Sequence, residues 1–139
     1  MNNHLHFSIF YDGGAQNGRG YGSYVVIGPE GLVSYSAKRL HFMGQANGFL
    51  AEYETLHRAL MSLGKCLSKK KIDPQATFLH IYGDNRFVQG QLMGENRCLQ
   101  PSSVILNGKV GARLKRFAGY EAHYFTRVGI KTILGQKVT

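Results

Sequence analysis

The hydrophobic period of this chain changes near residue 50, and that change constrains the fold more than any other feature. Before it, three segments rich in β-branched and aromatic side chains are separated by a Gly-rich turn and a Pro-Glu-Gly turn, which predicts strands at 5–12, 24–27 and 32–37 and a turn at 13–22. From Leu50, apolar residues recur at helical spacing until Gly64, which we interpret as the helix end. The first half therefore predicts an antiparallel meander and then a helix of about four turns.

The second half predicts alternating strands and helices. Residues 76–82 form a short apolar run beyond Asp73-Pro74, as a buried strand does. Later patterns predict a short helix, a helix capped by Pro101-Ser102-Ser103, a last strand and a short C-terminal helix, at 85–93, 104–117, 122–126 and after Ile130. We expect one α/β domain over residues 1–139, with a mixed five-stranded sheet of three antiparallel and then parallel strands, and helices on both faces.

The composition is that of a globular protein, with 43% hydrophobic and 18% charged residues. No apolar run approaches about 18 residues and the N-terminus lacks a signal-peptide pattern, so we expect a soluble cytoplasmic protein without a membrane partner. Cys66 and Cys98 show no CxxC spacing, which predicts reduced thiols. The six histidines contain no HxxxH or HExxH pair, so we expect packing or surface roles rather than zinc binding, including for His80 and His123.

The chain is strongly basic, with 17 Lys and Arg against 8 Asp and Glu and a net charge of +9. A field of this sign attracts polyanions such as nucleic acids, although many small proteins are basic for solubility alone. Lys109, Arg113 and Arg116 fall on one helical stripe that suits a phosphate backbone or a merely solvated face. The run Lys69-Lys70-Lys71 is typical of a solvated loop.

Three of the few acidic residues occupy distinctive places, namely Asp12 in a predicted strand before two glycines, Glu52 at a helix start and Asp84 at a strand end. Taken singly, each has an ordinary structural interpretation as a turn cap, a favourable helix N-terminal charge and a helix N-cap. Taken together on a basic chain, they are typical of carboxylates that gather divalent cations against phosphate.

The three motifs and the order of elements together resemble type 1 ribonuclease H, especially its short archaeal-type branch. The motifs are Phe10-Tyr11-Asp12-Gly13-Gly14, Ala51-Glu52-Tyr53 and the twelve residues 83–94, and the resemblance covers nearly the whole chain. It implies endonucleolytic hydrolysis of the RNA strand of RNA/DNA hybrids with two Mg²⁺ or Mn²⁺ ions, leaving 5′-phosphomonoesters. Asp12 would bridge both ions, and Glu52 and Asp84 would complete the site.

The resemblance also implies substrate contacts. The family uses glycines after its first Asp for close backbone approach, polar residues just past the third acid, and an Arg after the last strand. The matching residues are Gly13, Gly14, Asn85, Arg86 and Arg127. Where the family has two adjacent Asn three and four residues before the helix Glu, this chain has Gly48 and Phe49, with Asn47 one place earlier as the expected contact.

One family feature is missing from the sequence. The family carries a fourth carboxylate about seven residues past the Arg that Arg127 resembles, where this chain has Leu134, and no Asp occurs after Asp84. We therefore expect attenuated, Mn²⁺-favouring activity on RNA/DNA hybrids, with double-stranded RNA as a second substrate to test and no evident obligate protein partner. The alternative is a nucleic-acid-binding module on a ribonuclease H-like fold that has lost turnover.

Overall fold

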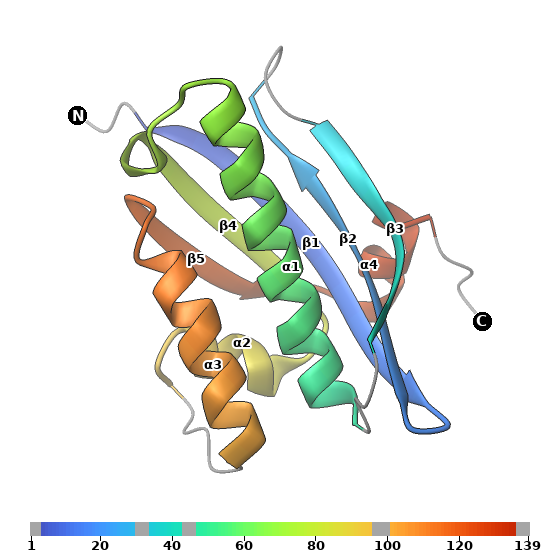
Figure 1. Cartoon of the computed structure of the whole chain (residues 1–139). Helices are drawn as coiled ribbons and strands as arrows, with labels where there is room; N and C mark the ends of the chain where they lie inside the picture. The colour runs from blue at the N-terminus through green and yellow to red at the C-terminus, as the bar shows by residue number, and fades with distance from the viewer. Residues whose placement is uncertain (1–3, 30–33, 43–46, 96–100, 136–139) are drawn as a thin grey trace.

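The computed structural model describes residues 4–29, 34–42, 47–95 and 101–135. Its strands form one mixed sheet in the order β3-β2-β1-β4-β5 (Figure 1). The strands are β1 Leu5–Gln16, β2 Arg19–Ile27, β3 Ser34–Phe42, β4 Thr77–Gly83 and β5 Gly119–Tyr124. The pairs β1-β2 and β2-β3 are antiparallel, and β1-β4 and β4-β5 are parallel. The expected α/β fold with a mixed sheet is confirmed.

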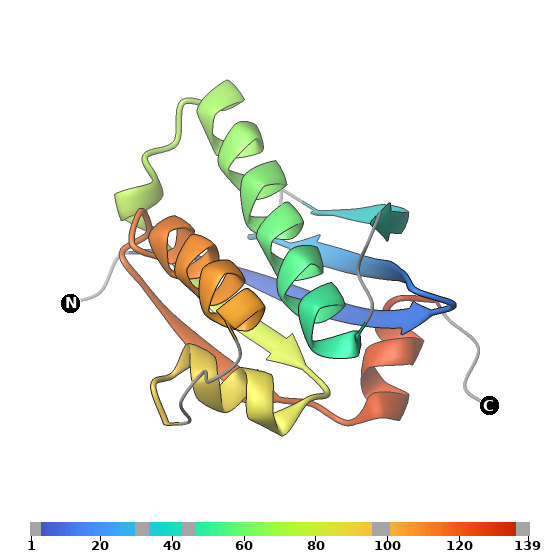
Figure 2. The same ribbon diagram turned by 60° about the horizontal axis from the view of Figure 1, so that its bottom comes forward.

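Helices lie on both faces of the sheet, and they cover one face more fully than the other. They are α1 Gly48–Lys69, α2 Arg86–Leu92, α3 Pro101–Leu114 and α4 Arg127–Ile133, with a 3₁₀ turn at Pro74–Ala76. Helices α1 and α3 lie over one face, and α4 lies on the other side of the sheet (Figure 2). Among the described residues, no helix combines the length and apolar character needed to cross a membrane.

The core lies between the sheet and α1. Alternation along β1 buries every second side chain beneath the helix, and the helical stripe of α1 buries its matching leucines. The largest fully buried side chains there are Phe7, Ile9, Tyr11, Tyr53, Leu56, Leu60, Leu63, Leu67, Leu79 and Ile81. This packing fixes α1 directly over the central strand β1, where the helix makes its closest approach.

The Gly-rich turn predicted at 13–22 is wrong. Strands β1 and β2 stay paired as far as Gln16 and Arg19, so Gly13 and Gly14 belong to a strand rather than to a loop. The turn is the dipeptide Asn17-Gly18, whose φ angles of 54° and 73° are those of a two-residue hairpin turn with the strand-matched twist. A long paired hairpin therefore replaces the predicted loop.

The helix end predicted at Gly64 is also wrong, because α1 continues to Lys69. Leu63 and Leu67 are both fully buried, and that packing outweighs the cost of one glycine in a helix, about 1 kcal/mol.

The ends of other predicted strands and helices differ from the observed ones by a few residues. The last strand ends at Tyr124, because the Thr126 side chain accepts a hydrogen bond from Gly129 N–H and caps α4, which begins at Arg127. Cys66 is a free thiol, and Cys98 lies outside the described residues, as do residues 32–33 of the third predicted strand.

Candidate active site

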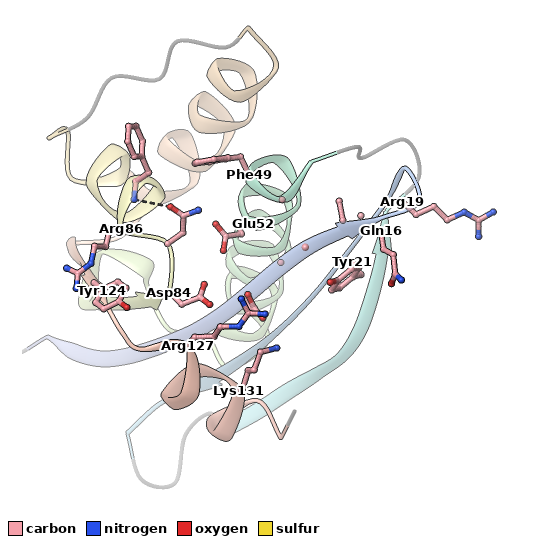
Figure 3. A pocket seen from close by; sticks show the side chains of 18 of the residues that line it. Gln16, Arg19, Tyr21, Phe49, Glu52, Asp84, Arg86, Tyr124, Arg127 and Lys131 are labelled. Carbon is pink, nitrogen blue, oxygen red and sulfur yellow. Dashed lines mark hydrogen bonds between the residues drawn. The ribbon is translucent and has the colours of Figure 1, made fainter. Parts of the chain in front are cut away.

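Three carboxylates converge at one end of the sheet. Phe10 on β1 pairs with Tyr82 on β4, so Asp12 and Asp84, each two residues further on, emerge side by side from parallel strands. Glu52 reaches them from the second turn of α1 (Figure 3). One carboxylate oxygen from each of the three lies within 4.8 Å of the others.

A glycine permits this convergence. A Cβ atom at Gly13 would lie 2.6 Å from the carbonyl carbon of Ala51 and 2.7 Å from the backbone nitrogen of Glu52. The helix backbone therefore rests on the strand at a distance that only glycine allows. This contact brings Glu52 to the level of Asp12.

Burial and the neighbouring carboxylates raise the pKa values of Glu52 and Asp12. Burial, with the added repulsion of Asp84 and Asp12, raises the pKa of Glu52 from its ordinary value of 4.5 to about 9. Burial and Asp84 also raise the pKa of Asp12. Glu52 is only 5% exposed, and its buried Oε2 atom has no hydrogen-bond partner among the described residues. A buried acceptor without a donor is costly, and a cation placed between the carboxylates would relieve both the repulsion and the missing contact.

Helix α4 presents two cations to this cluster. Arg127 and Lys131 point toward it (Figure 3), and both lower the pKa of Asp12, against the larger effect of burial. Leu134, which the family resemblance places at the fourth carboxylate, is the C-cap of α4, whereas Arg127 and Lys131 are the α4 side chains that line the groove. The helix has no acidic residue in its sequence.

An open groove surrounds the carboxylates. Five residues expected to contact substrate line it, namely Gly13, Gly14, Asn85, Arg86 and Arg127. Asn47 does not line it, because its side chain caps α1 by accepting a hydrogen bond from Leu50 N–H at 2.9 Å.

Sequence analysis missed several residues of the groove. They are Gln16, Arg19, Tyr21, Phe49, Phe87, Tyr124 and Lys131. The Asn-Gly dipeptide at 17–18 was the available signal for the first three, because it predicts a tight hairpin that brings both strand ends to the groove. No pattern in the sequence pointed to the others. The stripe of Lys109, Arg113 and Arg116 does not line this groove.

Aromatic rings and cations lie together in the lining of the groove. The guanidinium of Arg86 lies 3.7 Å from the ring centroid of Tyr124, a cation–π contact. The rings of Phe49 and Phe87 meet edge to face with centroids 6.3 Å apart, and Phe87 is 56% exposed. Exposed rings beside cations are suited to stacking with bases and holding phosphates.

The loop that carries Asp84 is tied to the sheet through Gln89 on α2. Its amide nitrogen donates to Ile81 O at 2.9 Å and to His123 O at 2.8 Å, and its Oε1 accepts from the Tyr11 hydroxyl. Asn85, next to Asp84, caps α2 by accepting from the N–H groups of Phe87 and Val88. These bonds tie the segment on both sides of Asp84 to the sheet and to α2.

Comparison with solved structures defines the fold. The N-terminal RNase H domain of Rv2228c from Mycobacterium tuberculosis, solved as a fusion with maltose-binding protein, matches with a TM-score of 0.74 at 18% identity, over 92% of this chain and 87% of that chain. RNase H1 of the halophilic archaeon Halobacterium salinarum matches with a TM-score of 0.68 at 18% identity, over 92% and 89%.

A third structure contains a bound nucleic acid. LC11-RNase H1 in complex with an RNA/DNA hybrid matches with a TM-score of 0.73 at 18% identity, over 91% of this chain and 89% of that chain. No protein-family model matches the chain, and no curated protein sequence does. The chain therefore has the ribonuclease H fold of type 1, shared at low sequence identity.

Proposed function

We propose that this protein is a ribonuclease H, which hydrolyses the RNA strand of RNA/DNA hybrids endonucleolytically and leaves 5′-phosphomonoesters. The observation that carries the proposal is the convergence of Asp12, Glu52 and Asp84 within 4.8 Å in a groove of a chain with net charge +9. Carboxylates attract divalent cations, and the basic surface attracts the phosphate backbone. The hybrid bound in the LC11 structure supports the substrate class by analogy of fold.

Asp12, Glu52 and Asp84 would hold Mg²⁺ or Mn²⁺. The fit rests on the buried Oε2 of Glu52, which has no hydrogen-bond partner in the described part of the chain, and on an all-oxygen donor set, which such hard cations prefer. When bound, the ion supplies charge neutralisation and Lewis-acid polarisation of the phosphodiester. Two ions would share Asp12, as in a two-metal site.

The cations on α4 are expected to weaken the binding of the second metal ion. Lys131 and Arg127 face Asp12 on the side where the resemblance implies a fourth carboxylate. Their positive charge would repel an ion there, while it would attract a phosphate oxygen of the substrate. We infer slow cleavage that needs a high metal concentration and favours Mn²⁺, whose coordination is less demanding.

Substrate recognition would use backbone and side chains of the groove. The backbone of Gly13 and Gly14 lines the groove and would meet the 2′-hydroxyls, which distinguish RNA from DNA. Asn85 and Arg86 follow Asp84 and would contact the sugar-phosphate backbone near the scissile bond. Phe87 would offer an exposed ring at the rim.

A second candidate function is hybrid binding without turnover. It is favoured by the pair of cations near Asp12 and by the absence of any acidic residue on α4. The test is a gel assay of purified protein with labelled RNA/DNA hybrid, double-stranded RNA and single-stranded RNA, in Mg²⁺, in Mn²⁺ and in EDTA. Metal-dependent cleavage of the hybrid's RNA strand supports the enzyme. Retardation of the hybrid without cleavage in either metal supports the binding module.

A further inference from the structure

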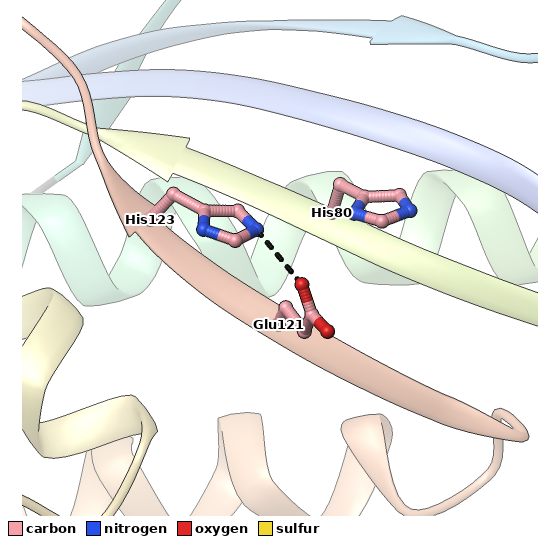
Figure 4. A group of neighbouring side chains, drawn as sticks. All are labelled: His80, Glu121 and His123. Carbon is pink, nitrogen blue, oxygen red and sulfur yellow. Dashed lines mark ion pairs between the residues drawn. The ribbon is translucent and has the colours of Figure 1, made fainter.

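A second cluster of metal-ligating side chains lies on the sheet face opposite α1, and it consists of His80, Glu121 and His123 (Figure 4). One ligand atom from each lies within 4.8 Å of the others. His80 on β4 pairs with Glu121 on β5, and His123 is two residues further along β5. Because side chains alternate along strands, all three point to the same face.

This cluster is separate from the carboxylate groove. None of its three residues lines that groove. His80 precedes Asp84 by four residues along β4, which corresponds to about 13 Å of extended strand. An ion bound at this cluster would therefore not share a ligand with the carboxylates.

The donor set selects a different class of ion. Imidazole nitrogens suit Zn²⁺ and its transition-metal neighbours, whereas carboxylates alone suit Mg²⁺ and Mn²⁺. Two His, one Glu and a water make a complete four-coordinate zinc shell. Ligands about 2.0–2.1 Å from a tetrahedral ion lie about 3.3 Å apart. His123 Nε2 and Glu121 Oε2 already lie 3.2 Å apart.

A fourth histidine orients the remaining ligand. His6 on β1 shares a hydrogen bond of 2.9 Å between its Nδ1 and Nε2 of His80. With Nε2 engaged, Nδ1 of His80 remains to coordinate, which is the outer-shell arrangement that fixes the ring of a metal-binding histidine. The rings of His80 and His123 are stacked within 14° of parallel with centroids 6.1 Å apart, so both rings would turn about their side-chain torsions to direct a nitrogen at one ion.

The cluster is open to an incoming ion. The side chains of His123 and Glu121 are 40% and 52% exposed. The ion pair between these two residues does not include His80, whose polar contact is with His6. A bound ion would connect β5 to β4.

We propose that His80, Glu121 and His123 bind one Zn²⁺ ion, with water as the fourth ligand and His6 as the residue that orients His80. The sequence lacks the local HxxxH spacing because these ligands come from two neighbouring strands, which only the β4-β5 register brings together.

The test is Zn²⁺ binding to the full-length protein, measured by competition with a chromophoric chelator in excess Mg²⁺, together with Tm. We expect one Zn²⁺ per chain and a higher Tm, because an ion that binds only the folded state stabilises it. His80→Gln and His123→Gln should each weaken binding by at least about tenfold, and His6→Ala by about 10–100-fold. His57→Gln on α1 is the matched control and should bind as the wild type does.

Ring-nitrogen NMR provides a second readout, in which Zn²⁺ should shift the resonances of His80 and His123 and leave those of His57 unchanged. If a histidine variant fails to fold, Glu121→Gln at an exposed position provides the same comparison. Zinc binding that survives His123→Gln and is lost in Asp12→Asn would assign the ion to the carboxylates and overturn the proposal. A wild-type protein that binds no Zn²⁺ would also overturn it.

Discussion

Gly13→Ala is expected to separate the carboxylates by moving α1 away from β1. The new methyl group would lie 2.6 Å from the Ala51 carbonyl, against an ordinary contact of 3.4 Å or more, and the obstacle is backbone that cannot rotate aside. The helix must therefore retreat by about 0.8 Å. Overpacking of this kind lowers the free energy of unfolding by about 1–3 kcal/mol. Because Glu52 moves with the helix, metal-dependent cleavage should fall by about 100-fold.

The assay pairs urea unfolding with initial rates of hybrid cleavage in Mn²⁺. Gly64→Ala is the matched control, because it lies on the same helix and its Cβ would meet nothing within 4 Å. It should raise the free energy of unfolding by about 0.5–1 kcal/mol and leave cleavage unchanged. A Gly13→Ala protein with wild-type stability and wild-type cleavage would refute the argument that this contact positions Glu52.

Three further predictions follow from the charges of the site. Because the folded-state pKa of Glu52 is about 9 and its ordinary value is 4.5, the metal-free protein gains stability from this proton below about pH 4.5 and loses it progressively as the pH rises to about 9. Thermal melts in EDTA across this pH range should show Tm falling as the pH rises, and Mg²⁺ affinity should rise over the same range. A Glu52→Gln variant whose Tm falls with pH as steeply as that of the wild type would contradict the assignment of this pKa to Glu52. Lys131→Asp should lower the Mn²⁺ concentration for half-maximal cleavage by about tenfold, because an added carboxylate strengthens a cation site. Leu134→Asp, outside the groove, should have little effect. Equal Mn²⁺ requirements in the wild type and both variants would contradict the position given to Lys131. Hybrid binding by Asp12→Asn in EDTA should weaken with salt along a log–log slope of magnitude about 3 or more, and a flat response would exclude phosphate contacts as the source of affinity.

The order of elements could be predicted because hydrophobic period and turn chemistry are local. The alternation of β1 and the leucine stripe of α1 identify the sheet and its covering helix. The proximity of Asp12, inside β1, and Asp84, just past the end of β4, follows from the parallel pairing of these strands, which a strand–helix–strand order already favours.

Features that depend on register or packing could not be predicted in this way. The buried Leu67 carries α1 past Gly64, and the pairing of Gln16 with Arg19 turns a supposed loop into a hairpin. Lys131 could be placed in the groove only once the start of α4 was known. His80 and Glu121 are distant in sequence, so their meeting required the register of β4 and β5.

The central claim is that Asp12, Glu52 and Asp84 form the metal site of a hybrid-cleaving nuclease. Its most direct test is RNA-strand cleavage in a labelled RNA/DNA hybrid by wild type, Asp12→Asn and Asp73→Asn, with Mn²⁺ and with EDTA. Asp73 is the matched control, because its side chain only caps a 3₁₀ turn by accepting from Gln75 N–H. We predict metal-dependent cleavage by wild type and Asp73→Asn, and none by Asp12→Asn, although it still binds the hybrid. Cleavage by Asp12→Asn within about tenfold of wild type, which is about 1.4 kcal/mol in barrier height, would contradict the claim.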